Sequence, residues 1–499
     1  MGISQLPAAT SGAASAGTQT FTSSGTWTAP AGVTAVTATV VGGGGGGGAS
    51  GNSTTNSNYN FPGGGGAGGV VTTQTVSVTP GTTYSVVVGS GGSKGTATNN
   101  DSAFVTAGAG GYSSFALSYT VQNAITNGAR ELGTGDWLQG EEPNSSVTNP
   151  PSYPNGYNGS PQPATNTSTT NRTSITNVTG LFEAGRTTWF TNDRGNSGYR
   201  DLILWVPVVQ DTQYILSAYG GSNSSNMNGR IRIDWYSAFN SGLLGNMQST
   251  TQTLPTTNWV RLSATGTSPS GATWALVRLM SDGTSPIYTG VLLQTGSTQN
   301  NYVGPLTSSS NKVVSGLGLI SVTAGVVNNG GGGGNGCRTT TVVAGSGFGG
   351  GQAVTTGGAF TMGGNGAGAG TPGVFNIVAS QNAIPYINTF SLPSNGGGGI
   401  SSGNAAITLN STNGGYIIQP NGSTGLNGYG AGGMGARGSQ VVAGIPGPGV
   451  GAPVSVGNAG NSATANTGAG GGGGMYTTSG SSGGVNGGDG GSGIVILSW

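Results

Sequence analysis

The sequence predicts an all-β protein in which a glycine-rich frame, made of β-strands and polyglycine-II-type segments, holds an inserted β-sandwich of the jelly-roll kind. Three observations predict it. Glycine supplies 105 of the 499 residues, without the strict three-residue period of collagen. Runs of alternating β-branched residues, separated by Gly, Pro, Asn and Ser, are typical of short strands. Charged residues and tryptophans concentrate in one internal segment, which divides the chain by composition.

That internal segment is residues 118–305. It contains 9 of the 13 Lys and Arg residues, 10 of the 12 Asp and Glu residues and 6 of the 8 tryptophans, but only 21 of the 105 glycines. We interpret it as a globular insert between two arms of a glycine-rich frame, residues 21–117 and 306–499. Residues 1–20 precede the frame as a separate N-terminal segment.

The arms show strands punctuated by turns. Pro30 and Gly32 predict a turn before a strand over residues 33–41, in which Val36, Ala38 and Val40 share one face. Residues 70–78 and 84–88 predict a hairpin around Pro80-Gly81, and a short strand begins at Tyr112. The second arm has few strand signals before its apolar end, residues 493–499. Exposed, that end would promote aggregation, so we predict that it closes a sheet beside residues 36–41.

The glycine tracts have two interpretations. They are either flexible tethers or extended polyglycine-II-type helices that rise about 3.1 Å per residue. Ordering Gly costs about 0.5–1 kcal/mol more than ordering Ala, so ordered tracts need compensating contacts. Backbone-to-backbone bundling would supply N–H···O bonds and Cα–H···O contacts, with neighbours from the same chain or from other copies. The tracts are residues 42–48, 63–66, 330–334, 396–399 and 470–474.

The insert has strand patterns at short intervals, which favours a β-sandwich or jelly roll. In the segment RIRIDWY, alternation places Ile231, Ile233 and Trp235 on one face and the polar residues on the other. We expect Trp205, Trp235, Trp259 and Trp274 to lie in the core. The predicted strands are residues 202–209, 213–219, 230–236, 259–265, 274–280 and 290–294.

Composition argues against several functions. The chain has no His, which removes the usual general base, the serine triad and most zinc sites. Glu141 and Glu142 are sequence neighbours and would point opposite ways in an extended chain, unlike a facing glycosidase pair. The 13 basic and 12 acidic residues provide no field for nucleic acid or an anionic membrane, and no apolar stretch is long enough for membrane insertion. We expect no enzyme activity, cofactor or metal.

Sugar binding requires aromatic faces and planar polar groups. A long polar loop that starts at Asp136 carries Trp137, Tyr153 and Tyr157, which makes these three candidates. The polar face of the strand over residues 230–236 supplies the other candidate glycan-binding residues, Arg230, Arg232, Asp234 and Tyr236. Alternatively, the loop aromatics pin the loop to the sandwich, and the Arg and Asp residues form a solvated face paired across strands.

Both arms carry landmarks of a known family in the same order. FTSSGTWTAPAGVTAVTATVVGGGGGGG from Phe21, VTPGTTYSVVVGSGG from Val78, GYSSFAL from Gly111, GGGGG from Gly470 and GGDGGSGIVILSW from Gly487 resemble the glycine-rich domain of bacteriophage tail fibre and receptor-binding proteins. Residues 199–305 resemble the carbohydrate-binding-module-like jelly rolls that phage tail proteins and bacterial glycosidases often carry. The opening MGISQLPAAT is similar to short N-terminal segments of tail proteins, which implies an attachment segment.

The resemblance implies a structural virion protein, a tail fibre or minor tail protein whose insert recognises a host cell-surface polysaccharide during adsorption. It also implies a homotrimer and contacts with other tail proteins through the N-terminal segment. The N-terminus has no secretory signal pattern, which suits a particle assembled in the host cytoplasm and freed by lysis. The alternatives are a purely structural tail or baseplate component whose jelly roll makes protein contacts, and a cellular glycine-rich adhesin or ice-binding protein.

Overall fold

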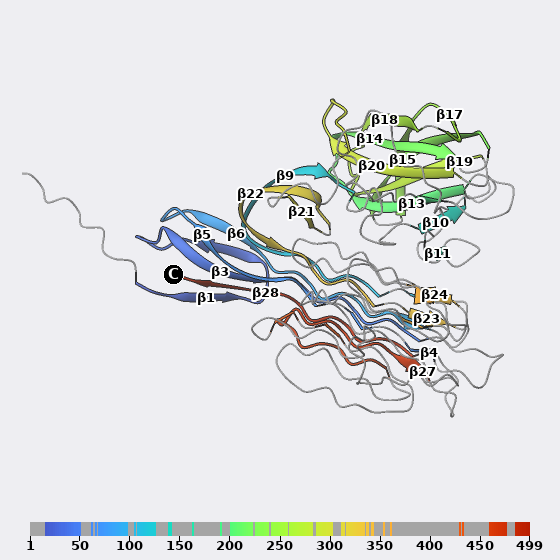
Figure 1. The fold of residues 1–499 in the computed structure, drawn as a ribbon. Coiled ribbons are helices and arrows are strands. Elements are labelled where there is room, and N and C mark those ends of the chain that lie inside the picture. The colour runs from blue at the N-terminus through green and yellow to red at the C-terminus, as the bar shows by residue number, and fades with distance from the viewer. Residues whose placement is uncertain are drawn as a thin grey trace, which may run out of the picture.

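The computed structural model describes an all-β chain with no helix in its described residues. The fold has three parts, which Figure 1 shows as a pair of sheets, a set of parallel extended rods and a separate sandwich. The described residues are 15–50, 61–62, 65–66, 68–97, 104–105, 107–125, 138–141, 162–163, 190–191, 200–222, 225–238, 241–257, 259–282, 286–302, 311–314, 316–334, 336–338, 341–343, 353–354, 360–361, 429–430, 432–433, 459–476 and 485–499.

Two antiparallel sheets face each other at one end of the frame. The first has the order β1 (Thr18–Phe21), β28 (Ile494–Ser498), β3 (Ala35–Val41) and β5 (Val71–Ser77). The second has the order β2 (Gly25–Thr28), β6 (Thr83–Val87), β9 (Ser113–Asn123), β22 (Gly318–Asn328) and β21 (Asn311–Val314). Their inner faces share one core, in which Val36, Ala38 and Val40 lie as the alternation predicts.

The C-terminal strand closes the first sheet, which confirms the prediction. β28 pairs antiparallel with β3, with Ile494 opposite Val41 and Ser498 opposite Thr37. On its other side β28 pairs with β1, and the backbones of Gly17 and Trp499 exchange two hydrogen bonds of 2.9 Å. An apolar segment that would be exposed as an edge is therefore covered on both sides.

The predicted hairpin over residues 70–78 and 84–88 is wrong. The turn exists, because Gly81 has a φ of 79° and the Thr82 N–H donates to the Thr79 carbonyl. However, β5 pairs with β3 in the first sheet, and β6 pairs with β2 and β9 in the second. The turn therefore carries the chain from one sheet to the other, and turn chemistry alone does not reveal which strands pair.

The glycine tract over residues 42–48 is an ordered rod at the centre of the bundle, and every residue of it is buried. Its hydrogen bonds repeat every three residues, as expected for a helix with three residues per turn. Gly43 and Gly46 donate to Gly111 and Gly108, whereas Gly44 and Gly47 donate to Gly491 and Gly488. Three other segments donate hydrogen bonds to the carbonyl oxygens of the rod. Gly331 and Gly334 donate to Gly43 and Gly46, and Gly92 and Gly95 donate to Gly44 and Gly47. Gly471 and Gly474 donate to Gly45 and Gly48.

A sixth neighbour completes the ring around this central rod. Gly42 donates to the Val70 carbonyl at 3.0 Å, and Gly66 lies against the Gly45 carbonyl. All six neighbours belong to the same chain, so the rod interpretation is correct for this tract and the bundle needs no second copy to surround it. The homotrimer stays a prediction.

The rods pack so closely that no side chain fits between them. A Cβ built on any residue from Gly42 to Gly47 would lie 1.9–2.1 Å from a backbone oxygen of a neighbouring rod. Oxygens in that position face the Cα–H bonds, as in the Cα–H···O contacts of close backbone packing. Together with the N–H···O bonds, each worth about 0.5–1.5 kcal/mol net, these contacts offset the entropy lost by ordering glycine.

The insert is a β-sandwich, as predicted. One sheet has the order β11 (Gln162–Pro163), β10 (Leu138–Glu141), β13 (Arg200–Pro207), β19 (Trp274–Ser281), β15 (Met227–Ala238) and β16 (Ser241–Gln248), and β17 (Gln252–Leu254) also pairs with β15. The other has the order β12 (Phe190–Thr191), β20 (Pro286–Thr295), β14 (Gln213–Ser222) and β18 (Val260–Thr267). Ile231, Ile233 and Trp235 lie in the core between them, which confirms the predicted face of β15.

A ribbon of three strands, β9, β22 and β21, joins the frame to the insert, and the last residue of β9 is buried Asn123. Strands β9 and β22 pair beyond residue 118, where the sequence places the start of the insert. The Asn123 amide accepts a hydrogen bond from Leu293 N at 3.0 Å and donates one to Val291 O at 3.1 Å. It also accepts from Ile125 N at 2.9 Å. The Asn123 side chain therefore pairs with the backbone of β20 as a neighbouring strand would, and it connects the ribbon to the sandwich.

Strands β21 and β22 in the second arm are not predicted by the sequence pattern. Gly325 interrupts the alternation of β22 and takes a φ of 76° where the pairing with β9 shifts register. Ala116, nearby in β9, has a φ of 52°. These irregularities hide the strand from a period-two search. Short strand pairs lie toward the far end of the rods, where β4 (Phe61–Pro62) pairs with β27 (Met475–Tyr476) from the other arm (Figure 1).

We predict that Gly44→Ala disrupts the bundle. The added methyl would meet the Ala469 carbonyl oxygen at 1.9 Å, and overpacking of this kind costs about 3 kcal/mol or more when only backbone can move. Hydrogen exchange of peptides spanning residues 42–48 should accelerate strongly. Gly25→Ala is the matched control, because no atom lies within 4 Å of its Cβ position. Equal protection in the two variants would contradict the close-packed rod.

We predict that Asn123→Ala loosens the joint while both parts stay folded. It removes three hydrogen bonds and leaves buried backbone groups unpaired, a local cost of about 2–4 kcal/mol. Amide exchange at Ile125 and Leu293 should become faster, with the sandwich core still protected. Gln122→Ala, at the neighbouring position, removes a side chain that donates to exposed Thr120 and should leave that exchange unchanged. Unaltered exchange in Asn123→Ala would show that the joint is held by other contacts.

Candidate functional site

The outer face of the seven-stranded sheet carries the aromatic, arginine, carboxylate and amide side chains of the candidate site. Cross-strand pairing arranges its side chains in rows across β19, β15 and β16. One row joins Trp274, Tyr236 and Leu243, and a second joins Leu276, Asp234 and Asn246. The third joins Arg278, Arg232 and Gln248. Aromatic and apolar groups therefore occupy one end of the face, and arginines occupy the other.

The aromatic end is a packed cluster. The Trp205 and Tyr236 rings lie 4.8 Å apart between centroids, with an interplanar angle of 58°. Tyr236 is only 3% exposed and packs with Ile203 and Leu276, while Trp205 and Trp274 are partly buried around them. Ring surface available to a ligand therefore belongs to the two tryptophans, and Tyr236 supports them from beneath.

A buried carboxylate organises the arginine end. Asp234 is 3% exposed. Its Oδ1 pairs with Arg232 Nε at 2.6 Å and its Oδ2 pairs with Arg278 Nη1 at 3.3 Å. The two guanidinium groups stand directly opposite each other on β15 and β19, a like-charge arrangement that is unfavourable without a counterion. Asp234 therefore holds both arginines in position.

The open side of the face lies over β16. Asn246 and Gln248 are exposed there, opposite Asp234 and Arg232 respectively, and Leu243 is 50% exposed. The Arg232 side chain is 21% exposed, against 6% for Arg278. A ligand approaching from this side meets amide groups, one edge of a guanidinium and an apolar rim.

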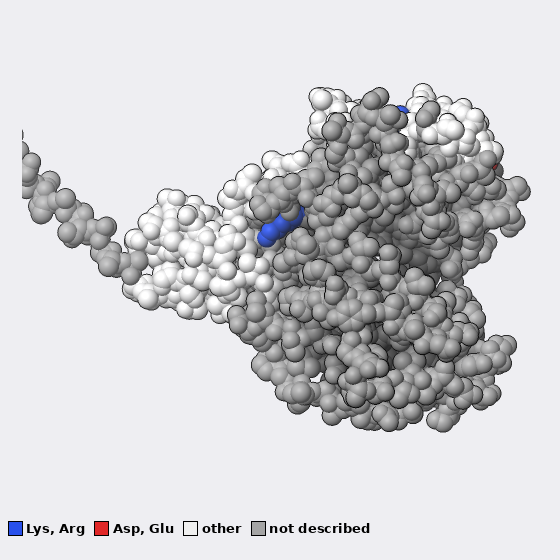
Figure 2. All heavy atoms as spheres, viewed as in Figure 1, with Lys and Arg blue, Asp and Glu red and all other residues white. Residues whose placement is uncertain are grey.

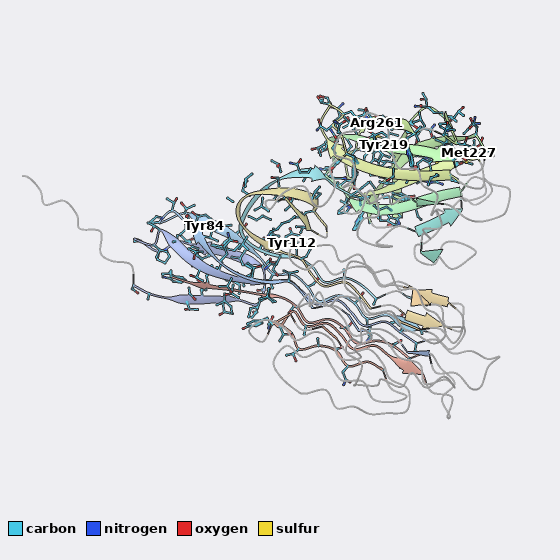
Figure 3. The ribbon with its side chains drawn as sticks, in the orientation of Figure 1. Tyr84, Tyr112, Tyr219, Met227 and Arg261 are labelled. Atoms are coloured by element: carbon cyan, nitrogen blue, oxygen red, sulfur yellow. The ribbon has the colours of Figure 1, made fainter. Side chains whose placement is uncertain are left out.

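The second sheet has a different character on its outer face. Arg261 lies over the Tyr219 ring at 5.5 Å from its centroid and also bonds to Ser217 and to the carbonyl of Asn300. Figure 3 shows Tyr219 and Arg261 close together at one end of the insert, with Met227 at the other. Tyr219 is 6% exposed, so this pair stabilises the chain that returns toward the frame.

Four of the seven predicted site residues therefore lie on one face. Arg230, Arg232, Asp234 and Tyr236 share the outer side of β15, although Asp234 and Tyr236 are buried rather than solvated. The alternative of pairing across strands is correct for Asp234 and Arg278. Trp137, Tyr153 and Tyr157 lie outside the described residues.

The expected core position of the tryptophans is right for Trp235 and wrong for Trp205 and Trp274. Leu204 and Val206 enter the core from β13, and Ala275 and Val277 enter it from β19, so alternation turns both tryptophans outward. Trp259 is partly buried just before β18. Asn246, Gln248 and Arg278 also lie on this face and were not among the predicted site residues. The alternation Asn246-Met247-Gln248 was an available signal, but Gly242 and Gly245 obscure the strand.

Other kinds of site find no support in the described part of the chain. It holds no cluster of three or more His, Cys, Asp or Glu side chains able to bind a metal ion. Within the same ranges, no helix has the length and apolar character needed to cross a bilayer. Figure 2 shows that the described surface in view carries almost no charge apart from a small basic spot.

We predict that the insert loses stability at high pH through Tyr236. Burial raises the pKa of its phenol to about 12, with Asp234 adding to the rise and Arg278 and Arg232 opposing it. An unfolded tyrosine ionises near pH ~10, so the stabilisation is complete below that pH and is lost as the pH rises through about 12. Urea unfolding of Tyr236→Phe should depend less on pH in this window than that of the wild type. An identical dependence would contradict it.

Solved structures with weak similarity include the enzymatically active domain of bacteriophage CBA120 tailspike protein 4, at 10% identity and a TM-score of 0.24, covering 35% of this chain and 21% of that one. A CBM4 module has 13% identity, a TM-score of 0.19 and coverage of 22% and 73%. The xylan-binding CBM22-1 domain of Paenibacillus barcinonensis Xyn10C has 11% identity, a TM-score of 0.20 and coverage of 24% and 80%. At such scores these likenesses assign no ligand.

The match to the tailspike domain spans only about a fifth of that domain's length. No curated protein sequence matches the chain. The family model for the glycine-rich domain matches residues 16–273, just over half of the 499 residues. The matched region begins just before β1 and contains the central glycine rod. The chain belongs to the glycine-rich domain family.

Proposed function

We propose that this protein displays a glycan-binding sandwich on a rigid glycine-rich frame. The observation that carries the proposal is the outer face of β13, β19, β15 and β16, which holds partly exposed Trp205 and Trp274, an oriented arginine and two exposed amides. Aromatic faces stack on the apolar faces of sugar rings, and guanidinium and amide groups form paired hydrogen bonds with hydroxyls.

We propose further that the protein is a structural component of a bacteriophage tail, a tail fibre or minor tail protein that adsorbs to host polysaccharide. The support is the order of landmarks in both arms, from the strand and glycine run after Phe21 to the closing strand that ends at Trp499. In this proposal the protein is a homotrimer in the virion, assembled in the host cytoplasm. It attaches to other tail proteins through its N-terminal segment and binds neither nucleic acid nor membrane.

The proposed role is binding without catalysis. The chain lacks histidine altogether, and the carboxylate of Asp234 on this face is engaged by two arginines. Both oxygens of this carboxylate are held by these contacts, so neither is directed at a ligand. The residues of the face are thus suited to orient a sugar and not to cleave it.

We predict that Trp274→Ala weakens binding of the full chain to host polysaccharide at least about tenfold, equivalent to about 1.4 kcal/mol, because a stacking surface is removed. Affinity electrophoresis in gels containing extracted host polysaccharides measures the change. Tyr119→Ala is the control, since Tyr119 is 37% exposed and belongs to β9, which is a strand of neither sandwich sheet. Wild-type binding by Trp274→Ala, or no binding by the wild type, would refute the proposal.

A further inference from the structure

Arg232 differs from the other arginines of the outer face in how it is held. Its Nε donates to Asp234 Oδ1 at 2.6 Å, which fixes the plane of the guanidinium. Its two terminal nitrogens have no hydrogen-bond partner among the described residues. The side chain is 21% exposed, so the terminal edge of the guanidinium is held in place and accessible.

Arg232 is the more accessible of the two arginines that contact Asp234. The side chain of Arg278 is 6% exposed, whereas that of Arg232 is 21% exposed. Because Asp234 and Arg278 beside it are almost completely buried, Arg232 borders a region of low dielectric, in which ionic hydrogen bonds are stronger.

We propose that this face recognises an acidic glycan and that Arg232 binds the carboxylate of a uronate residue. This inference rests on the proposed glycan-binding function. The free edge of a guanidinium presents two parallel N–H donors that match the two oxygens of a carboxylate. Exposed Gln248, opposite Arg232, and Asn246, opposite Asp234, supply hydrogen bonds for the hydroxyls of the same sugar.

The arrangement assigns separate roles along the face. Trp205 and Trp274 stack on rings of the polymer irrespective of its charge, whereas Arg232 selects the acidic unit. Asp234 is a positioning residue, because its contacts are with Arg232 and Arg278 and its burial keeps it from the ligand. The near balance of 13 basic and 12 acidic residues over the chain means that preference for an anion must come from this local site.

The test uses the full chain and a panel of uronate-containing bacterial capsular polysaccharides, each paired with its own carboxyl-reduced derivative. We expect at least one native polymer to bind about tenfold or more tightly than its reduced form at low ionic strength, with the preference shrinking as salt is added. Arg232→Gln should abolish the preference. Arg232→Lys, which keeps the charge without the paired donors, should retain a smaller one.

Lys94→Gln is the matched control, since it removes one positive charge from a side chain that is 43% exposed on the frame. Thermal melts and circular dichroism confirm that each variant is folded. Equal binding of native and reduced polymers, or an unchanged preference in Arg232→Gln, would overturn the acidic-glycan inference while leaving glycan binding intact. Absence of binding to every polysaccharide, native and reduced, would instead overturn the proposed function itself.

Discussion

The structure depends on backbone-to-backbone contact between glycine rods. The central rod over residues 42–48 has six neighbours from its own chain and exchanges hydrogen bonds with them in a repeat of three. Contact this close is available only to residues without a Cβ, because carbonyl oxygens occupy the positions where side chains would begin. In most proteins apolar side chains fill the interior. Here hydrogen-bonded main chain fills it, which explains how a chain so rich in glycine forms an ordered body.

The two sheets at the end of the rods bring the segments into register. Strand β3 runs directly into the central rod, and β9 follows another. Asn328, at the end of β22, donates to the Val40 carbonyl at 2.7 Å and accepts from Thr72, so polar side chains connect the sheets where the rods begin. The apolar core between the sheets thus anchors rods that have no side chains of their own to align them.

Much of this fold is predictable from sequence, and the failures have physical causes. Alternation correctly places Val36 and Ile233 in their cores, and the apolar end of the chain correctly predicts a buried closing strand. The pairing partners of the strands on either side of Gly81 were not predictable. A turn residue shows that the chain reverses, but it does not show which sheet the next strand joins. For the site, β15 revealed Arg232 and Asp234, but Arg278 joins them from a strand 44 residues later, a proximity that only the fold creates.

The repeat of three along each rod limits how the chain can change in length. Since a helix of this type turns once every three residues, removing a single glycine from residues 42–48 would swing each later amide by a third of a turn, toward a different neighbour. Removing three would restore every orientation and shorten the rod by about 9 Å. Viable length variants among natural relatives should therefore differ by multiples of three residues in these tracts, which means insertions or deletions of nine nucleotides in the gene.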